Sequence, residues 1–174
     1  KKIKFGIIGA GVIAEEYLKY LVKNEKINIE GIVGKTKKNS KKLSLKYKIN
    51  FYGNSIDDLL KKDPDIIIVA VNILSTINVA KKLSEFNGII LFEKPLGVNL
   101  TETKKIYRLL NKNKHKCFVA LNRRFYENIT FAKKLLIDDK SKKIIQVLDQ
   151  ENILVAKNFG HPQKVLKNWM YANS

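Results

Sequence analysis

Short apolar runs alternate with amphipathic segments along residues 1–121 of the chain. The runs are rich in Ile and Val and predict strands, whereas apolar residues spaced three or four apart predict the helices between them. Strands are expected at 5–8, 27–33, 49–52, 65–71, 88–92 and 117–121. Helices are expected from about residue 12, at 39–47, after Ser55, and at 76–86, 100–110 and 126–137. This alternation predicts an α/β fold with a doubly wound parallel sheet.

The run at 65–71 reads DIIIVAV and is the clearest strand in the chain. A continuous apolar run with many β-branched residues is typical of a strand that is buried on both faces. We therefore expect this strand near the centre of the parallel sheet.

The alternation ends after residue 121. A helical segment and a polar stretch then lead to a strand-like stretch at 143–151. We expect one domain at 1–121 and the start of a second, incomplete α/β domain at 122–174. Without the rest of its sheet, Ile145 and Val147 should be poorly covered. Because the sequence also begins without Met, we expect it to be a piece of a longer protein.

A glycine-rich turn joins the first strand to the first helix. Residues 9–14 read GAGVIA, which fits the pattern G-x-G-x-x-A of a Rossmann-type dinucleotide site. There the first glycine permits a tight turn, the second lets the backbone approach a pyrophosphate, and the small third residue lets helix and strand pack closely. The free N–H groups of the helix start hold the anion. The predicted cofactor-binding residues in this turn are Gly9, Ala10, Gly11, Val12 and Ile13.

The end of the second strand bears on which dinucleotide is bound. An acidic residue usually binds the adenosine ribose there, but residues 34–38 read GKTKK and contain no acid. Lys35 and Thr36 would instead favour a 2′-phosphate. Lysine is frequent throughout this chain, so both residues are also consistent with background composition. We expect NADP or NAD as cofactor, with NADP slightly favoured.

Two further motifs follow the fifth and sixth strands, at the edge where open α/β sheets bind ligands. Glu93-Lys94-Pro95 comes directly after the fifth strand, and Asn122-Arg123 begins the sequence NRRF after the sixth. A lysine at this edge can donate to an alcohol or carbonyl oxygen, which makes Lys94 a candidate catalytic residue.

Together the three motifs resemble the Gfo/Idh/MocA family, that of glucose–fructose oxidoreductase and inositol dehydrogenase. The matching segments are GIIGAG at 6–11, FEKPLG at 92–97 and NRRF at 122–125. The resemblance implies an N-terminal Rossmann domain and a C-terminal α/β domain that often supports homo-oligomers. It also implies hydride transfer between nicotinamide and a secondary alcohol or ketone of a small sugar, cyclitol or nucleotide-sugar-like substrate.

The resemblance also implies roles for single residues. Lys94 matches a catalytic or substrate-binding lysine of the family, and both Glu93 and Lys94 are expected to contact the cofactor. Arg123 is expected near both substrate and cofactor, and Asn122 is expected to bind substrate.

The chain departs from the family in one loop. Residues 71–76 read VNILST where the family commonly has T-P-x-x-x-H. We expect Asn72 still to reach the cofactor, with Ser75 or Thr76 as substitute polar contacts. The usual catalytic His and its partner Asp come from a later helix, so we expect them beyond Ser174.

The net charge of +18 raises the question of a nucleic-acid partner. Among the 34 basic residues only Arg108, Arg123 and Arg124 are arginines, the type that base-reading surfaces favour. The lysines are scattered and no zinc-ligand spacing occurs, so we expect neither nucleic acid nor a metal. No apolar run approaches the roughly 20 residues that span a bilayer. With Cys117 as the single cysteine, a cytoplasmic protein without membrane contact is expected.

Two other functions use the same glycine turn. A non-catalytic NAD(P)-binding sensor or regulator would need Gly9 and Gly11 but not Lys94. A transferase that binds S-adenosylmethionine or a nucleotide would need neither E-K-P nor N-R-R-F, so these motifs favour the oxidoreductase.

Overall fold

The computed structural model describes residues 1–111, 116–137, 141, 144 and 146. Six strands form one sheet in the order β3-β2-β1-β4-β5-β6, and every neighbouring pair is parallel. The strands are β1 (Ile3–Ile8), β2 (Ile27–Val33), β3 (Tyr52–Gly53), β4 (Ile66–Val69), β5 (Ile89–Phe92) and β6 (Cys117–Val119). The expected doubly wound parallel sheet is confirmed, and β4 lies at its centre, between β1 and β5.

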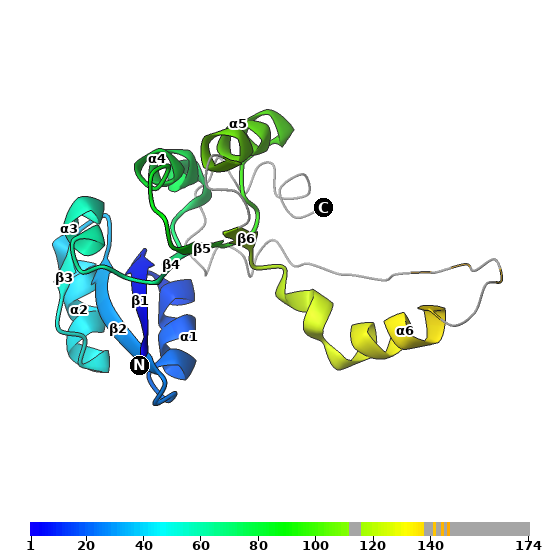
Figure 1. Cartoon of the computed structure of the whole chain (residues 1–174), viewed down its shortest axis with the longest axis horizontal. Helices are drawn as coiled ribbons and strands as arrows, with labels where there is room; N and C mark the ends of the chain where they lie inside the picture. Colours follow the sequence, from blue (N-terminus) through cyan, green and yellow to red (C-terminus); the bar gives the residue numbers. More distant parts are fainter. Residues whose placement is uncertain (112–115, 138–140, 142–143, 145, 147–174) are drawn as a thin grey trace, which may run out of the picture.

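The strands are joined by helices (Figure 1). The α-helices are α1 (Val12–Leu21), α2 (Lys37–Tyr47), α3 (Ile56–Leu60), α4 (Thr76–Lys82), α5 (Leu100–Leu110) and α6 (Glu127–Ile137). Two short 3₁₀ helices, η1 (Ile73–Ser75) and η3 (Asn122–Phe125), follow β4 and β6.

Two apolar clusters hold the helices on opposite faces of the sheet. Ile7 of β1 packs with Ala14 and Leu18 of α1 and with α2. The next residue, Ile8, belongs to a second cluster that contains buried residues of α3, α4 and α5. This change of face follows from the alternation of side chains along a strand. Each fully buried Ile or Leu contributes about 1.5–3 kcal/mol relative to its exposed state, so both helix layers are firmly attached.

Two helix starts show how the sequence sets element boundaries. The Ser55 hydroxyl accepts a hydrogen bond from the Asp58 N–H at 3.2 Å, as expected for the N-cap of α3. The Asn99 side chain accepts from the Glu102 N–H at 2.9 Å and starts α5 in the same way. Each cap satisfies an N–H group that the helix leaves without a partner.

The expected strand at 49–52 is wrong in position. Ile49 is buried in the cluster beneath α1 and α2, and its N–H donates to the Ser44 carbonyl at 2.9 Å. Ile49 is therefore bonded to the last turn of α2, and the chain joins the sheet only at Tyr52–Gly53, where it pairs with the end of β2. The expected helix at 76–86 is likewise shorter and ends at Lys82.

Beyond β6, helix α6 extends away from the sheet (Figure 1). None of its residues is buried. The strand-like stretch expected at 143–151 lies mostly outside the described residues, as do Ile145 and Val147. The division at residues 121 and 122 stays a prediction.

Candidate active site

The strand order reverses between β1 and β4, because the chain builds outward from β1 to β3 and then from β4 to β6 on the other side. In open α/β sheets, ligands bind beside the carboxyl ends of the strands at such a point. Gly9 follows β1 directly there. Its N–H donates to the Val33 carbonyl at 2.7 Å, and the neighbouring Ala70 N–H donates to the Ile8 carbonyl at 2.7 Å.

Position 9 can accommodate only glycine, because of its backbone conformation and its close neighbours. Its φ is +116°, a conformation that residues with a side chain rarely adopt. A Cβ atom there would lie 2.1 Å from the Ala70 carbonyl oxygen. The turn can therefore pass close to β4 only without a side chain.

Gly11, in contrast, borders open space. A Cβ atom added there would have no heavy atom within 4 Å. Gly11 is the N-cap of α1 and has no side chain to cap the helix, and Val12 and Ile13 after it are 50% and 46% exposed. The first N–H groups of a helix lack partners within it and attract anions. Ala14, the small third residue of the motif, is fully buried against the sheet. An open cradle before a helix start fits a dinucleotide pyrophosphate.

The end of β2 lies beside this turn. A Cβ atom on Gly34 would come within 2.9 Å of the Ala10 Cβ, so the two backbones are close. Lys35 and Thr36 follow and are both exposed. Thr36 is the N-cap of α2, yet its hydroxyl makes no capping hydrogen bond. Both residues therefore lie open to solvent just after the point where β2 approaches the glycine turn.

Asn72 starts η1 after β4. Its side-chain oxygen accepts a hydrogen bond from the Leu74 N–H at 3.0 Å, so that oxygen shapes the local turn. Asn72 is itself exposed, as is Ser75, whereas Thr76 is buried. Of the two residues expected to replace the missing histidine, Ser75 is exposed to solvent and Thr76 is not.

Glu93 and Lys94 follow β5 at the same edge. The Glu93 N–H donates to the Val69 carbonyl at 3.0 Å, which places Glu93 next to the end of β4. The Lys94 N–H donates to Glu93 Oε2 at 3.3 Å, and the Lys94–Pro95 peptide bond is cis. Lys94 is exposed, and its ammonium forms no ion pair with any described carboxylate.

Tyr17 of α1 contacts the candidate site, although no sequence motif pointed to it. Its hydroxyl donates to Glu93 Oε1 at 2.5 Å, across 76 positions of sequence. Burial, then the hydrogen bond to Glu93 and the charge of that carboxylate, raise the pKa of Tyr17 well above its usual value of 10.0. Tyr17 is therefore a neutral donor near pH 7. In the sequence Tyr17 is only one residue of the helix expected from about residue 12, and the polar hydroxyl of tyrosine was the one available signal.

Asn122 and Arg123 begin η3, which follows β6. Phe92 pairs with Val119, and the Ala120 N–H donates to the Phe92 carbonyl at 2.8 Å. The topology therefore brings Asn122 and Arg123 to the edge that carries Lys94.

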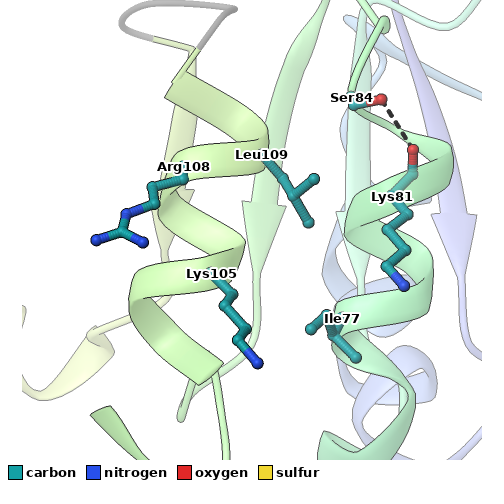
Figure 2. Close-up of a pocket in the computed structure, with 6 residues that line it drawn as sticks. All are labelled: Ile77, Lys81, Ser84, Lys105, Arg108 and Leu109. Atoms are coloured by element: carbon teal, nitrogen blue, oxygen red, sulfur yellow. Dashed lines mark hydrogen bonds between the residues drawn. The ribbon is translucent and has the colours of Figure 1, made fainter. Parts of the chain in front are cut away.

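A separate groove of about 490 Å³ lies between α4 and α5. In Figure 2, Leu109 of α5 and Ile77 of α4 both point toward the space between the two helices, while Arg108 points away. Lys81, Ser84 and Lys105 complete the lining. The groove contains none of the predicted site residues.

Two absences apply to the described part of the chain. Within it, no three His, Cys, Asp or Glu side chains gather closely enough to hold a metal ion. No helix there is both long and apolar enough to cross a bilayer.

Residues 3–121 match the model of the family described as "Oxidoreductase family, NAD-binding Rossmann fold". No curated protein sequence matches the chain.

Several solved structures share the fold at low identity. One is the WlbA dehydrogenase from Bordetella pertussis in complex with NADH and UDP-GlcNAcA. It has 17% sequence identity and a TM-score of 0.70, and the match covers 78% of this chain and 42% of that chain. Another is a putative NADPH-dependent oxidoreductase from Desulfitobacterium hafniense. It has 19% sequence identity and a TM-score of 0.71, and the match covers 78% of this chain and 39% of that chain. A putative myo-inositol dehydrogenase from Sinorhizobium meliloti has 19% identity and a TM-score of 0.69, with 79% and 41% covered. The chain thus spans about two fifths of each.

Proposed function

The chain belongs to the Gfo/Idh/MocA family of oxidoreductases, whose Rossmann fold binds NAD, and from this premise we propose the reaction and the residues that carry it. The protein is an NAD(P)-dependent dehydrogenase or reductase. Its substrate is a small molecule with a secondary alcohol or ketone, of the sugar, cyclitol or nucleotide-sugar-like class. Solved structures with the same fold include a putative myo-inositol dehydrogenase and a dehydrogenase in complex with UDP-GlcNAcA, which supports this class.

The glycine turn carries the proposal. The open space in front of Gly11 and the exposed first turn of α1 fit the pyrophosphate of a dinucleotide. The nicotinamide ring, when bound, takes up or supplies the hydride. Ala10, Val12 and Ile13 contribute backbone at the same place.

Lys94 is the catalytic residue within this chain. In the oxidation direction the carbinol C–H bond breaks with its electron pair, the hydroxyl proton leaves to a base, and the carbonyl double bond forms. Negative charge grows on the reacting oxygen as the proton leaves. The exposed Lys94 ammonium donates a hydrogen bond to that oxygen and lowers the energy of the transition state.

Four polar residues complete the proposed site. Asn122 and Arg123 bind polar groups of the substrate from η3, and Arg123 also lies near the cofactor. Asn72 contacts the cofactor through its amide nitrogen, because its oxygen is held by the Leu74 N–H. Glu93 borders the cofactor and orients Lys94.

We propose NADP as the preferred cofactor. Lys35 and Thr36 are exposed beside Ala10, where the adenosine 2′ position is expected, and residues 34–38 contain no carboxylate to repel a phosphate. Assembly into a homo-oligomer and a cytoplasmic location stay predictions.

The proposal is tested by adding NADH and NADPH to the complete protein and following nicotinamide fluorescence. Saturable binding that is lost when Gly11 is replaced by Asp supports the assignment. Binding of S-adenosylmethionine in place of both dinucleotides would overturn it. A sensor would bind the dinucleotide but show no turnover with any polyol or sugar, and replacing Lys94 would change nothing.

A further inference from the structure

One hydrogen bond links the helix of the glycine turn to the loop of the catalytic lysine. The Tyr17 hydroxyl on α1 donates to Glu93 Oε1, and Glu93 immediately precedes Lys94. Tyr17 and Glu93 are both partly buried, so little solvent competes for this bond. A hydrogen bond to a charged partner is stronger than one between neutral groups.

The second oxygen of the same carboxylate is also used. Glu93 Oε2 accepts the Lys94 N–H at 3.3 Å, so the carboxylate bridges the Tyr17 hydroxyl and the backbone of the lysine. A free carboxylate one residue away would be the nearest counter-ion for the Lys94 ammonium. Held by Tyr17, Glu93 forms no ion pair with Lys94 in the described part of the chain.

We propose that Tyr17 is a positioning residue that acts through Glu93 to fix the backbone of Lys94 and to keep its ammonium available for the substrate. This inference rests on the proposed function, since it requires Lys94 to be catalytic. Tyr17 does not touch the reacting atoms in this role. Its position on α1 means that the helix which holds the pyrophosphate also sets the place of the lysine.

The first test is kinetic and uses Tyr17→Phe, which removes only the hydroxyl. We expect kcat to fall about tenfold, the lower end of what losing a hydrogen bond to a charged group produces. The dissociation constant of the dinucleotide and the melting temperature should hardly change. Tyr20→Phe is the matched control, because Tyr20 lies on the same helix and is 72% exposed.

The second test asks whether Tyr17 acts through the lysine. On a Lys94→Ala background, Tyr17→Phe should lower kcat no further, because the side chain that it positions is gone. A full further tenfold loss would show that Tyr17 acts elsewhere and would overturn the inference. Loss of turnover in Lys94→Ala with normal turnover in Tyr17→Phe would overturn this inference alone. Normal turnover in Lys94→Ala would overturn the proposed function, and the inference with it.

The third test needs no turnover. With tyrosine labelled at the ring carbon that bears oxygen, NMR of the free protein should show a phenol signal that titrates well above the usual pKa of 10.0. The signal should be absent in Tyr17→Phe, and Glu93→Gln should lower the pKa of Tyr17 because it removes the carboxylate charge. Ordinary titration of Tyr17 near its usual pKa of 10.0 would show that the Glu93 contact is missing and would overturn the inference.

Discussion

Gly9 lies against Ala70 so closely that an added Cβ atom would sit 2.1 Å from the Ala70 carbonyl oxygen. Gly9→Ala should therefore be strongly destabilising, since the left-handed backbone alone costs about 1–3 kcal/mol and the steric clash adds to it. Gly11→Ala is the control, because its φ is −103° and the added Cβ meets nothing within 4 Å. Urea unfolding of both variants measures the difference. Similar stabilities would contradict the turn geometry.

Gly11→Asp should separate folding from cofactor binding. Aspartate is a favourable N-cap, so α1 should be kept or stabilised. Its carboxylate would occupy the cradle and repel the pyrophosphate, so we expect dinucleotide binding to weaken about 100-fold or more. Gly11→Asn has a side chain of the same size without the charge and should bind better than Gly11→Asp. Fluorescence titration with NADH and NADPH measures both, and unchanged binding to Gly11→Asp would remove the turn from the site.

Lys94→Ala should lower kcat of the complete protein by about 10²-fold or more, the scale for removing one electrostatic donor. Dinucleotide affinity should change little, because the proposed pyrophosphate contacts lie at the glycine turn. Lys94→Arg should restore little activity, since a planar guanidinium does not replace a compact ammonium. Steady-state kinetics and a cofactor titration distinguish the outcomes: a parallel loss of binding and turnover would mean a structural role.

Lys35→Ala should reduce the preference for NADPH over NADH. A charge-assisted contact with a 2′-phosphate contributes about 1.5–3 kcal/mol, so the ratio of the two dissociation constants should fall about tenfold or more. Lys41→Ala removes the same charge from an exposed position of α2 and should leave the ratio unchanged. An equal effect of both substitutions would show that Lys35 acts only through the overall charge of the protein.

The ion pair between Lys46 and Glu15 joins α2 to α1 at 2.5 Å and should make stability depend on pH. The hydrogen bond from Lys46 holds the pKa of Glu15 below its usual 4.5, and the same bond raises the pKa of Lys46 above its usual 10.5. A lowered carboxyl pKa stabilises the fold above the usual value and loses this contribution as pH falls. A raised lysine pKa stabilises it below the usual value and loses it as pH rises.

The destabilisation caused by Lys46→Ala should therefore be greatest between these two values and should shrink on acidification below 4.5. Thermal unfolding at several pH values checks this. Lys42→Ala on the same helix is the control, and a pH-independent effect of Lys46→Ala would contradict the prediction.

The sequence predicted the fold well where local signals agreed with packing. Helix α5 begins and ends where its spacing indicated, because the Asn99 cap and the apolar positions Ile106 and Leu110 favour the same boundaries. The strand expected at 49–52 failed because the burial of Ile49 beneath two helices outweighed its strand propensity. That burial depends on tertiary packing, which spacing along the chain does not encode.

The candidate site likewise has features that local sequence predicts and features that depend on tertiary packing. The glycine turn and the edge position of Lys94 follow from motifs next to predicted strands. The contact between Tyr17 and Glu93 joins residues 76 positions apart, and only the tertiary fold brings them together. The E-K-P motif identified Glu93 as a candidate residue but did not predict which groups its carboxylate binds.

The strand order β3-β2-β1-β4-β5-β6 has a consequence for how this protein can change. Residues proposed to select the cofactor follow β2, whereas residues proposed for chemistry follow β5 and β6 on the other side of the reversal. Cofactor choice and reaction are thus encoded in separate stretches of chain, and mutations in one stretch should combine almost additively with those in the other. Tyr17 is the exception, because it belongs to the first stretch and binds in the second. An evolutionary exchange of the first βαβ unit between relatives would therefore succeed only if the incoming helix brought its own partner for Glu93.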